Sequence, residues 1–344
     1  MRRFGLACIA VFVFPSAVPA QEGIGFRQMA DGNQTASNKV NGETLEALTG
    51  AFMAKMLDSN TVGNLTQSGT NTVNTIIHNG SLGSVVQHFD GHQTVANIVA
   101  LGHYSLKGTL VQDGTNIAGT AAAETLVFAD QLFGPDARQW ILNDAEIGVL
   151  AGEVSQRGVN IANVAKAEHA IGTAYQTIEL GAVQQVDNRL TLAASASIGA
   201  YISQYGENSG NIMKSDVVES ATRIFAGNQI VHNSITLTEL TSAHIEQRGV
   251  NIANLVQSSR IGSVRQISTG TQQVTNEVFG PDGQLLRGDN IVQTSDDVVN
   301  VTILSAPESG NDNGLLSVEQ DANFPQSSNA GGGSQTGNSA VVNR

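Results

Sequence analysis

The sequence has 344 residues, only 14% of them charged, and a formal net charge of −13 at pH 7. An acidic chain argues against nucleic acid and anionic lipid as partners, because both are bound through clustered Lys and Arg. A hydrophobic fraction of 40% is too high for a disordered linker. Gly, Asn, Gln and β-branched residues are abundant, whereas Pro and aromatic residues are scarce. That composition favours stacked strands over a core of large apolar side chains.

The first 20 residues have the layout of a cleaved signal peptide. Arg2 and Arg3 precede an apolar run of about ten residues, and Val18 and Ala20 are the small residues expected before a cleavage site. The run is shorter than the ~20 residues that span a bilayer, so a membrane anchor is the weaker interpretation. Cleavage after Ala20 removes the only cysteine, Cys8, and two of the 17 basic residues. With all 30 acidic residues retained, the net charge moves from −13 to −15. We therefore expect a secreted chain without disulfides.

An internal repeat dominates the rest of the chain. The motif Gln-x-Gly-x-Asn occurs five times, and residues 157–163 are identical to residues 248–254. The repeat positions are Gln67, Gly69, Asn71, Gln112, Gly114, Asn116, Gln156, Gly158, Asn160, Gln204, Gly206, Asn208, Gln247, Gly249 and Asn251. A regular spacing of this kind indicates a repeat architecture.

A second, looser unit alternates with the first. Gln87-x3-Gly91-x-Gln93-x3-Asn97 is echoed at residues 266–276, so the structural unit is about 22 residues long. Such a unit can form two short strands and a turn. We expect the motif Gly and Asn to form the bend, because both tolerate positive φ. Stacked Gln and Asn can pair their side-chain amides from one unit to the next.

The predicted fold is therefore all-β, a β-solenoid of stacked units of about 22 residues over 21–310. An ordinary β-sandwich in which these residues only form turns is the alternative. Apolar residues at helical spacing predict one short amphipathic helix over 43–58, and an irregular strand insertion is the alternative there. Phe-Gly-Pro-Asp occurs twice and predicts loop excursions over 125–145 and 277–292. Residues 311–344 form a Gly/Ser/Asn-rich tail with degenerate repeats.

The repeat residues resemble those of a known family. Gln247-x-Gly249-x-Asn251-x-Ala253-x3-Gln257 resembles the curlin repeat of bacterial curli, and residues 156–162 and 335–340 match in part. One residue separates Gly from Asn here, whereas two usually do so in curlins. The resemblance implies a β-solenoid on the cell surface, associated with the outer membrane, or in the biofilm matrix. The repeat style is also similar, more loosely, to that of the holdfast-anchoring surface proteins of stalked bacteria.

The sequence gives little sign of catalytic chemistry. His88-x3-His92 has a spacing that metal ligands use, but it falls in an expected strand and turn with no Cys nearby. Asp296 and Asp297 are adjacent and should point to opposite faces of a strand. No phosphate-binding loop, nucleophile elbow or His-Glu-x-x-His motif occurs. We therefore predict no catalytic residue, no metal and no cofactor.

The expected function is that of a secreted, curlin-like structural protein that mediates adhesion or fibre formation. Its expected partners are itself or other curlin-like subunits, the secretion and outer-membrane assembly machinery, and surface polysaccharide, with no nucleic acid. Two alternatives are a surface anchor that holds a polysaccharide adhesin and a β-helix enzyme that acts on polysaccharide. The enzyme is disfavoured by the shortage of aromatic and charged residues with which to line a substrate groove.

Overall fold

The computed structural model describes residues 24–41, 61–197, 199–239, 243–287, 290–304, 315–322, 326–329 and 332–342. The expected signal peptide (1–20) and the expected helix (43–58) lie outside these residues. Within them, no helix is long and apolar enough to cross a membrane.

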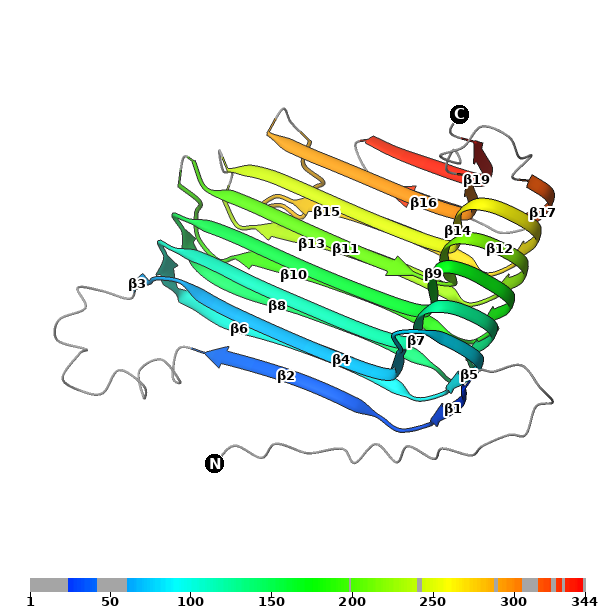
Figure 1. Cartoon of the computed structure of the whole chain (residues 1–344). Coiled ribbons are helices and arrows are strands. Elements are labelled where there is room, and N and C mark those ends of the chain that lie inside the picture. Colours follow the sequence, from blue (N-terminus) through cyan, green and yellow to red (C-terminus); the bar gives the residue numbers. More distant parts are fainter. Residues whose placement is uncertain are drawn as a thin grey trace, which may run out of the picture.

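The described chain is built from β-strands, which confirms the all-β prediction, and every pairing between named strands is parallel (Figure 1). Sheet A contains β1 (Ile24–Ala30), β4 (Leu65–Ile77), β5 (Ser81–Phe89), β7 (Thr109–Phe133), β9 (Glu153–Ile178), β11 (Tyr201–Ser209), β12 (Ile212–Phe225), β14 (His244–Ser268), β16 (Ile291–Leu304), β17 (Leu315–Ala322) and β19 (Gly332–Val342). Sheet B contains β2 (Gln34–Asn41), β3 (Thr61–Val62), β6 (His92–Leu106), β8 (Arg138–Leu150), β10 (Val183–Leu192), β13 (Asn228–Leu237), β15 (Thr271–Phe279) and β18 (Gln326–Asn329).

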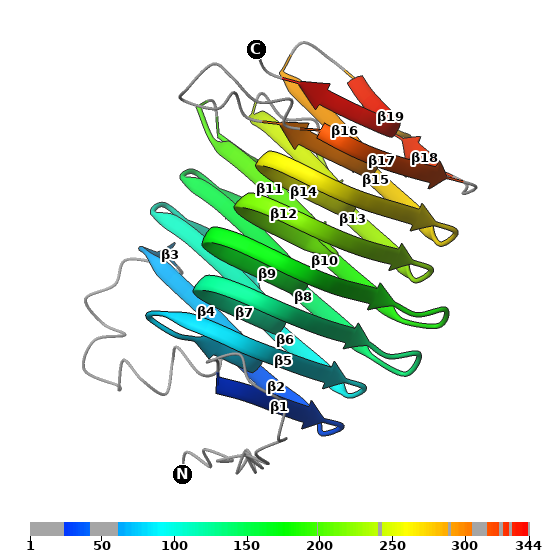
Figure 2. The same ribbon diagram turned by 45° about the vertical axis from the view of Figure 1, so that its right-hand side comes forward.

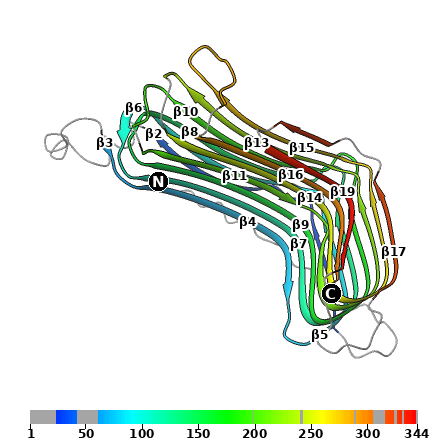
Figure 3. The same cartoon turned by 90° about the horizontal axis from the view of Figure 1, so that it is seen from above.

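The chain winds as a coil whose turns stack on one another (Figure 2). In each turn it runs along sheet A, bends, runs back along the second part of sheet A and returns through sheet B (Figure 3). We call the part where the first segment of sheet A faces sheet B the long arm, and the part beyond the bend the short arm. Between β4 and β16, strand partners in sheet A are 43 to 48 residues apart, as Asn160 and Asn208 show. Two units of about 22 residues therefore share one turn of the coil, which corrects the expectation that each unit forms a level of its own.

The bend lies three residues beyond the repeat motif. Asn74 and Asn163 have φ of 52° and 53°, and Gly119 in the equivalent position has φ of 70°. Gly249 and Asn251, which we expected to form a bend, instead lie within β14. The expectation was wrong because the motif glycine has a different task. A Cβ atom added to Gly249 would collide with Val274 of sheet B.

All five motif glycines share this environment. An added Cβ would approach within 3.0 Å of a valine or isoleucine on the facing strand in every case: Val95, Ile141, Val186, Val231 or Val274. Real Cβ contacts are almost never that short. The missing side chain therefore lets the two sheets of the long arm approach each other closely.

The two expected loop excursions have different outcomes. Residues 125–145 lie mostly in β7 and β8, and only 134–137 form a turn between them, so the first excursion is absent. Its Phe-Gly-Pro-Asp sequence makes the ordinary connection from sheet A to sheet B. In the second copy the connection from β15 to β16 does leave the coil, with Leu286 N–H donating to the Val278 carbonyl. The tail also joins the stack, because β17, β18 and β19 pair with β14, β15 and β16.

In a cross-section of the coil, the apolar core consists of separate clusters. One cluster fills the far end of the long arm, where Leu110 and Val154 pack with Ile147 and Leu190 of sheet B. A second fills the short arm and is rich in alanine, and a third, built on Phe89, Phe133 and Phe225, fills the junction of the arms. Small residues suffice because facing strands lie close together, and the scarcity of large side chains in the sequence follows from this.

We predict that Gly249→Ala lowers the free energy of unfolding by about 1–3 kcal/mol, because the methyl group overpacks the space that Val274 fills. Chemical denaturation of the purified chain from Gln21 onward, which is the mature chain that the sequence predicts, measures the loss. Gly63→Ala is the matched control, since nothing lies within 4 Å of its added Cβ. The double variant Gly249→Ala/Val274→Ala should recover part of the loss. A loss that the second substitution leaves unchanged would show that the sheet spacing is not its cause.

Candidate functional site

The fifteen repeat residues form three straight columns that run through the stack. In the register of sheet A, Gln67, Gln112, Gln156, Gln204 and Gln247 are successive partners, and the glycines and asparagines are aligned in the same way. The Gln and Asn side chains of all five copies are buried. The predicted alignment of the motif is therefore confirmed, and its chemistry is that of buried amides.

Each motif glutamine joins two neighbours along the stack and also joins the two sheets. Gln112 Nε2 donates to Gln67 Oε1 at 2.8 Å, and its own Oε1 accepts from Gln156 Nε2 at 2.8 Å. Gln112 Nε2 also donates to the Asn97 carbonyl of sheet B at 2.9 Å. Because a buried amide left unpaired costs about 1–3 kcal/mol, the column stabilises only a chain in correct register.

The motif asparagines form a second ladder of opposite polarity. Asn71 Nδ2 donates to Asn116 Oδ1 at 2.9 Å, and Asn116 Nδ2 donates to Asn160 Oδ1 at 3.0 Å. Asparagine amides thus donate toward the C-terminal end of the stack, whereas glutamine amides donate toward the N-terminal end. The backbone and both side-chain ladders therefore run in fixed directions along the stack, so its two ends are different.

Four further columns share this chemistry. Two lie in sheet B, one lies in the short arm and one at the bend. They run through Gln34, Gln93, Gln139, Gln184, Gln229 and Gln272; Asn38, Asn97, Asn143, Asn188, Asn233 and Asn276; Gln28, Gln87, Gln131 and Gln176; and Asn163, Asn211, Asn254 and Asn300. The looser sequence unit, whose imperfect copies lie at residues 176–188 and 227–233, revealed most of the sheet B positions, but Gln131, Gln139 and Asn143 were missed inside the supposed excursion. The signal that finds the last two is Gln139-x3-Asn143.

One column contains a buried arginine. Arg223 takes the glutamine position between Gln176 and Gln266 and has no exposed surface. Its Nη2 donates to Gln176 Oε1 at 2.9 Å, but Nε and Nη1 have no hydrogen-bond partner among the described residues. A guanidinium has no acceptor, so it cannot receive the amide of Gln266. Burial lowers the pKa of Arg223 well below its usual value.

A second column ends in a carboxyl group. Asp297 is the partner of Asn251, whose Nδ2 donates to Asp297 Oδ1 at 2.9 Å. Burial raises the pKa of Asp297 to about 6, the hydrogen bond from Asn251 opposes the rise, and the neighbouring Asp296 adds to it. Asp296 itself faces outward and lies 3.4 Å from Arg248, as expected for the next residue of a strand.

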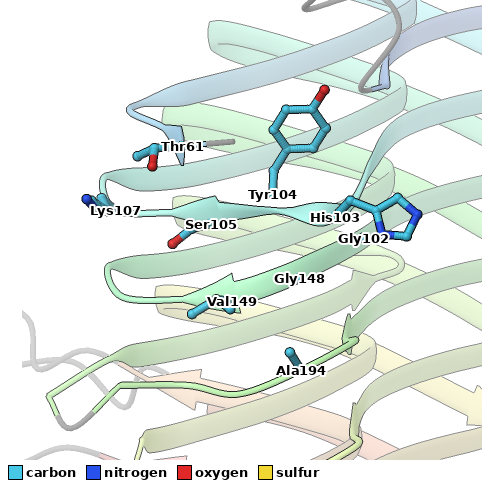
Figure 4. Close-up of a pocket in the computed structure, with 9 residues that line it drawn as sticks. All are labelled: Thr61, Gly102, His103, Tyr104, Ser105, Lys107, Gly148, Val149 and Ala194. Carbon is cyan, nitrogen blue, oxygen red and sulfur yellow. The ribbon is translucent and has the colours of Figure 1, made fainter. Parts of the chain in front are cut away.

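One hollow on the surface offers little chemistry. Its volume is about 350 Å³, and it lies where β6 bulges, so that Gly102, His103 and Tyr104 stand opposite Gly148. In Figure 4 the side chains of His103, Tyr104 and Lys107 point in different directions and do not converge on one point. Across the described part of the chain, no group of three or more His, Cys, Asp and Glu residues is placed to hold a metal ion.

Comparison with family models, with curated proteins and with solved structures gave no match for this chain.

We predict that Arg223→Gln raises the free energy of unfolding by about 1–3 kcal/mol, because the amide restores the ladder and removes a buried charge. Denaturant titrations of the mature chain measure the gain. Arg265→Gln is the control, since Arg265 lies on the surface beside Glu319, where an ion pair contributes little. Equal or lower stability of Arg223→Gln would contradict the conclusion that Arg223 destabilises its column.

We also predict a pH dependence from Asp297. Its pKa is higher in the folded chain (about 6) than the ordinary value of 3.8, so folding favours the protonated form. That contribution is complete below pH 4 and is lost as the pH rises through about 6. The loss approaches about 3 kcal/mol, at about 1.4 kcal/mol per tenfold change in the acid equilibrium. Asp297→Asn should therefore match the wild type near pH 4 and exceed it at pH 7. A constant difference from pH 4 to pH 7 would exclude Asp297 as the cause.

Proposed function

We propose that the chain is a secreted structural protein of the bacterial cell surface or biofilm matrix that forms fibres by stacking its turns end to end. The parallel coil with buried ladders fits a β-solenoid, which the resemblance to curlins also implies. The observation that carries the proposal is the shape of the two ends.

The strands fall into three tracks, each with seven strands or parts of strands among the described residues. The first-segment track runs from β4 to β19, the short-arm track from β1 to β17, and the sheet B track from β2 to β18. The first-segment track starts and finishes one turn later than the other two. The N-terminal end therefore has β1 and β2 without a described first segment beside them, and the C-terminal end has β19 without described partners for the rest of its turn.

Where the N-terminal end of one copy meets the C-terminal end of another, the two copies can form one complete turn together. β19 of one copy supplies the first segment, and β1 and β2 of the next copy supply the short arm and sheet B of the same turn. In the described residues β4 pairs only with β7, and β17 only with β14, so each has an edge to which a strand can be added. Parallel stacking joins the N-terminal end of one copy to the C-terminal end of the next. In that arrangement the Gln amides and the Asn amides keep, across the contact, the opposite donor directions that they have within one copy.

Unequal turns favour a second candidate function. Between β4 and β16 the turn length in sheet A varies from 43 to 48 residues, which makes the levels of one copy unlike one another. A monomer whose ends are covered could serve as a cell-surface anchor for a polysaccharide adhesin. The same assembly experiment separates the two candidates.

We predict that the purified mature chain lengthens, after a lag, into filaments that bind thioflavin. A variant that ends at residue 331 lacks β19 and should not elongate, although its circular dichroism should still show strands. Because its N-terminal end is intact, that variant should add to the C-terminal end of wild-type filaments and stop growth at that end at low molar ratio. A surface variant such as Tyr175→Ala should elongate normally. Filaments of the truncated variant at the wild-type rate would reject the shared turn, and a strictly monomeric wild type would favour the anchor.

A further inference from the structure

The outer face of sheet B carries the only tryptophan of the chain. Trp140 lies in β8 and remains 39% exposed, although large aromatic side chains are usually covered. Its neighbours on the same face come from the adjacent strands β10, β13 and β15. None of these outward-facing residues takes part in the ladders.

The indole ring is held by a buried carboxylate. Trp140 Nε1 donates to Asp187 Oδ2 at 2.8 Å, and Gln185 Nε2 donates to the same oxygen at 2.8 Å. The Asp187 side chain is only 2% exposed, and Arg189 Nη2 lies 3.7 Å from it. A ring fixed in advance loses little conformational freedom when a ligand covers it.

Polar groups continue from Trp140 across the neighbouring strands. His232 Nδ1 lies 3.8 Å from Asp187 Oδ1, and His232 Nε2 lies 3.5 Å from Glu277 Oε2. From β8 to β15 the polar groups cross four adjacent strands, a distance of about 15 Å along the stack. They offer N–H donors on Gln185, Arg189 and His232 and a carboxylate acceptor on Glu277.

We propose that this surface, which we call the Trp140 track, binds a neutral saccharide chain that lies along the stack. A sugar ring has a face of C–H groups that packs on an indole and a rim of hydroxyl groups that need both donors and acceptors. An anionic polymer is disfavoured by the net charge of −13. A cationic ligand is disfavoured because basic side chains already lie beside the carboxylates, Arg189 beside Asp144 and Asp187, and His232 beside Glu277. The proposal does not depend on fibre formation.

Tryptophan fluorescence tests the proposal directly, because every signal comes from Trp140. The mature chain is titrated with cellohexaose and chitohexaose as neutral probes, with hexagalacturonate as the anionic probe and with hexalysine as the cationic probe. We expect a saturable change in emission with at least one neutral probe and none with the charged probes. A response to neither neutral probe, or to a charged probe alone, would overturn the proposal.

Calorimetry then assigns the binding to the ring. Trp140→Ala should weaken binding of the neutral probe by about tenfold or more, because the stacking surface is lost. Tyr175→Ala is the matched control, since Tyr175 is 45% exposed on sheet A, away from the track, and binding should be unchanged. Unaltered melting curves show that both variants fold. Equal affinity of Trp140→Ala and wild type would place the saccharide elsewhere and reject the track.

Discussion

The pairing of buried side-chain amides is the constraint on which the rest of the structure depends. Gln112 satisfies its Nε2 and Oε1 only when Gln67 and Gln156 lie directly below and above it. Because side chains alternate between the two faces of a strand, a slip of one residue would turn every such amide outward and bring outward-facing polar groups into the core. Correct register thus follows from the cost of burying unpaired amides together with the apolar pattern, which the same slip would also turn outward. Six complete turns of the described chain can then stack on a core made largely of alanine and valine.

The glycines of the motif complete this constraint. Gln112 Nε2 reaches the Asn97 carbonyl of the facing strand at 2.9 Å, and that contact requires the sheets of the long arm to lie close together. Gly114 permits the approach because a Cβ there would collide with Ile141. The three residues of the motif therefore act together: Gly sets the separation of the sheets, and Gln and Asn form bonds that exist only at that separation.

The motif columns could be predicted because their residues are identical in type and evenly spaced, and they fixed the fold class. Other features could not be predicted, for separable physical reasons. The motif glycine was assigned to the bend because positive φ and close approach both select glycine, and only the facing Val274 distinguishes them. Gln131 and Gln139 were missed because the Phe-Gly-Pro-Asp sequence between them predicted a loop excursion, whereas it forms only the turn at 134–137. Arg223 stands at the Gln position of the looser unit, in Arg223-x3-Gly227-x-Gln229-x3-Asn233, but its burial was missed because an arginine is ordinarily a surface residue. Trp140, Asp187 and His232 meet only because successive turns place residues about 45 positions apart side by side.

The two residues that interrupt the ladders are placed unequally with respect to the ends. Arg223 lies in the middle of the stack, with turns on both sides of it, so the whole fold offsets the cost of burying its guanidinium. Asp297 lies in β16, directly below Gln335 of the terminal strand β19. A terminal strand has one neighbour instead of two and opens at a lower free energy than the interior. When Asp297 ionises as the pH rises through about 6, the loss of stability therefore affects the end of the stack, which already opens most easily. The strand β19, which the proposed fibre contact needs, is therefore held less firmly at neutral than at mildly acid pH.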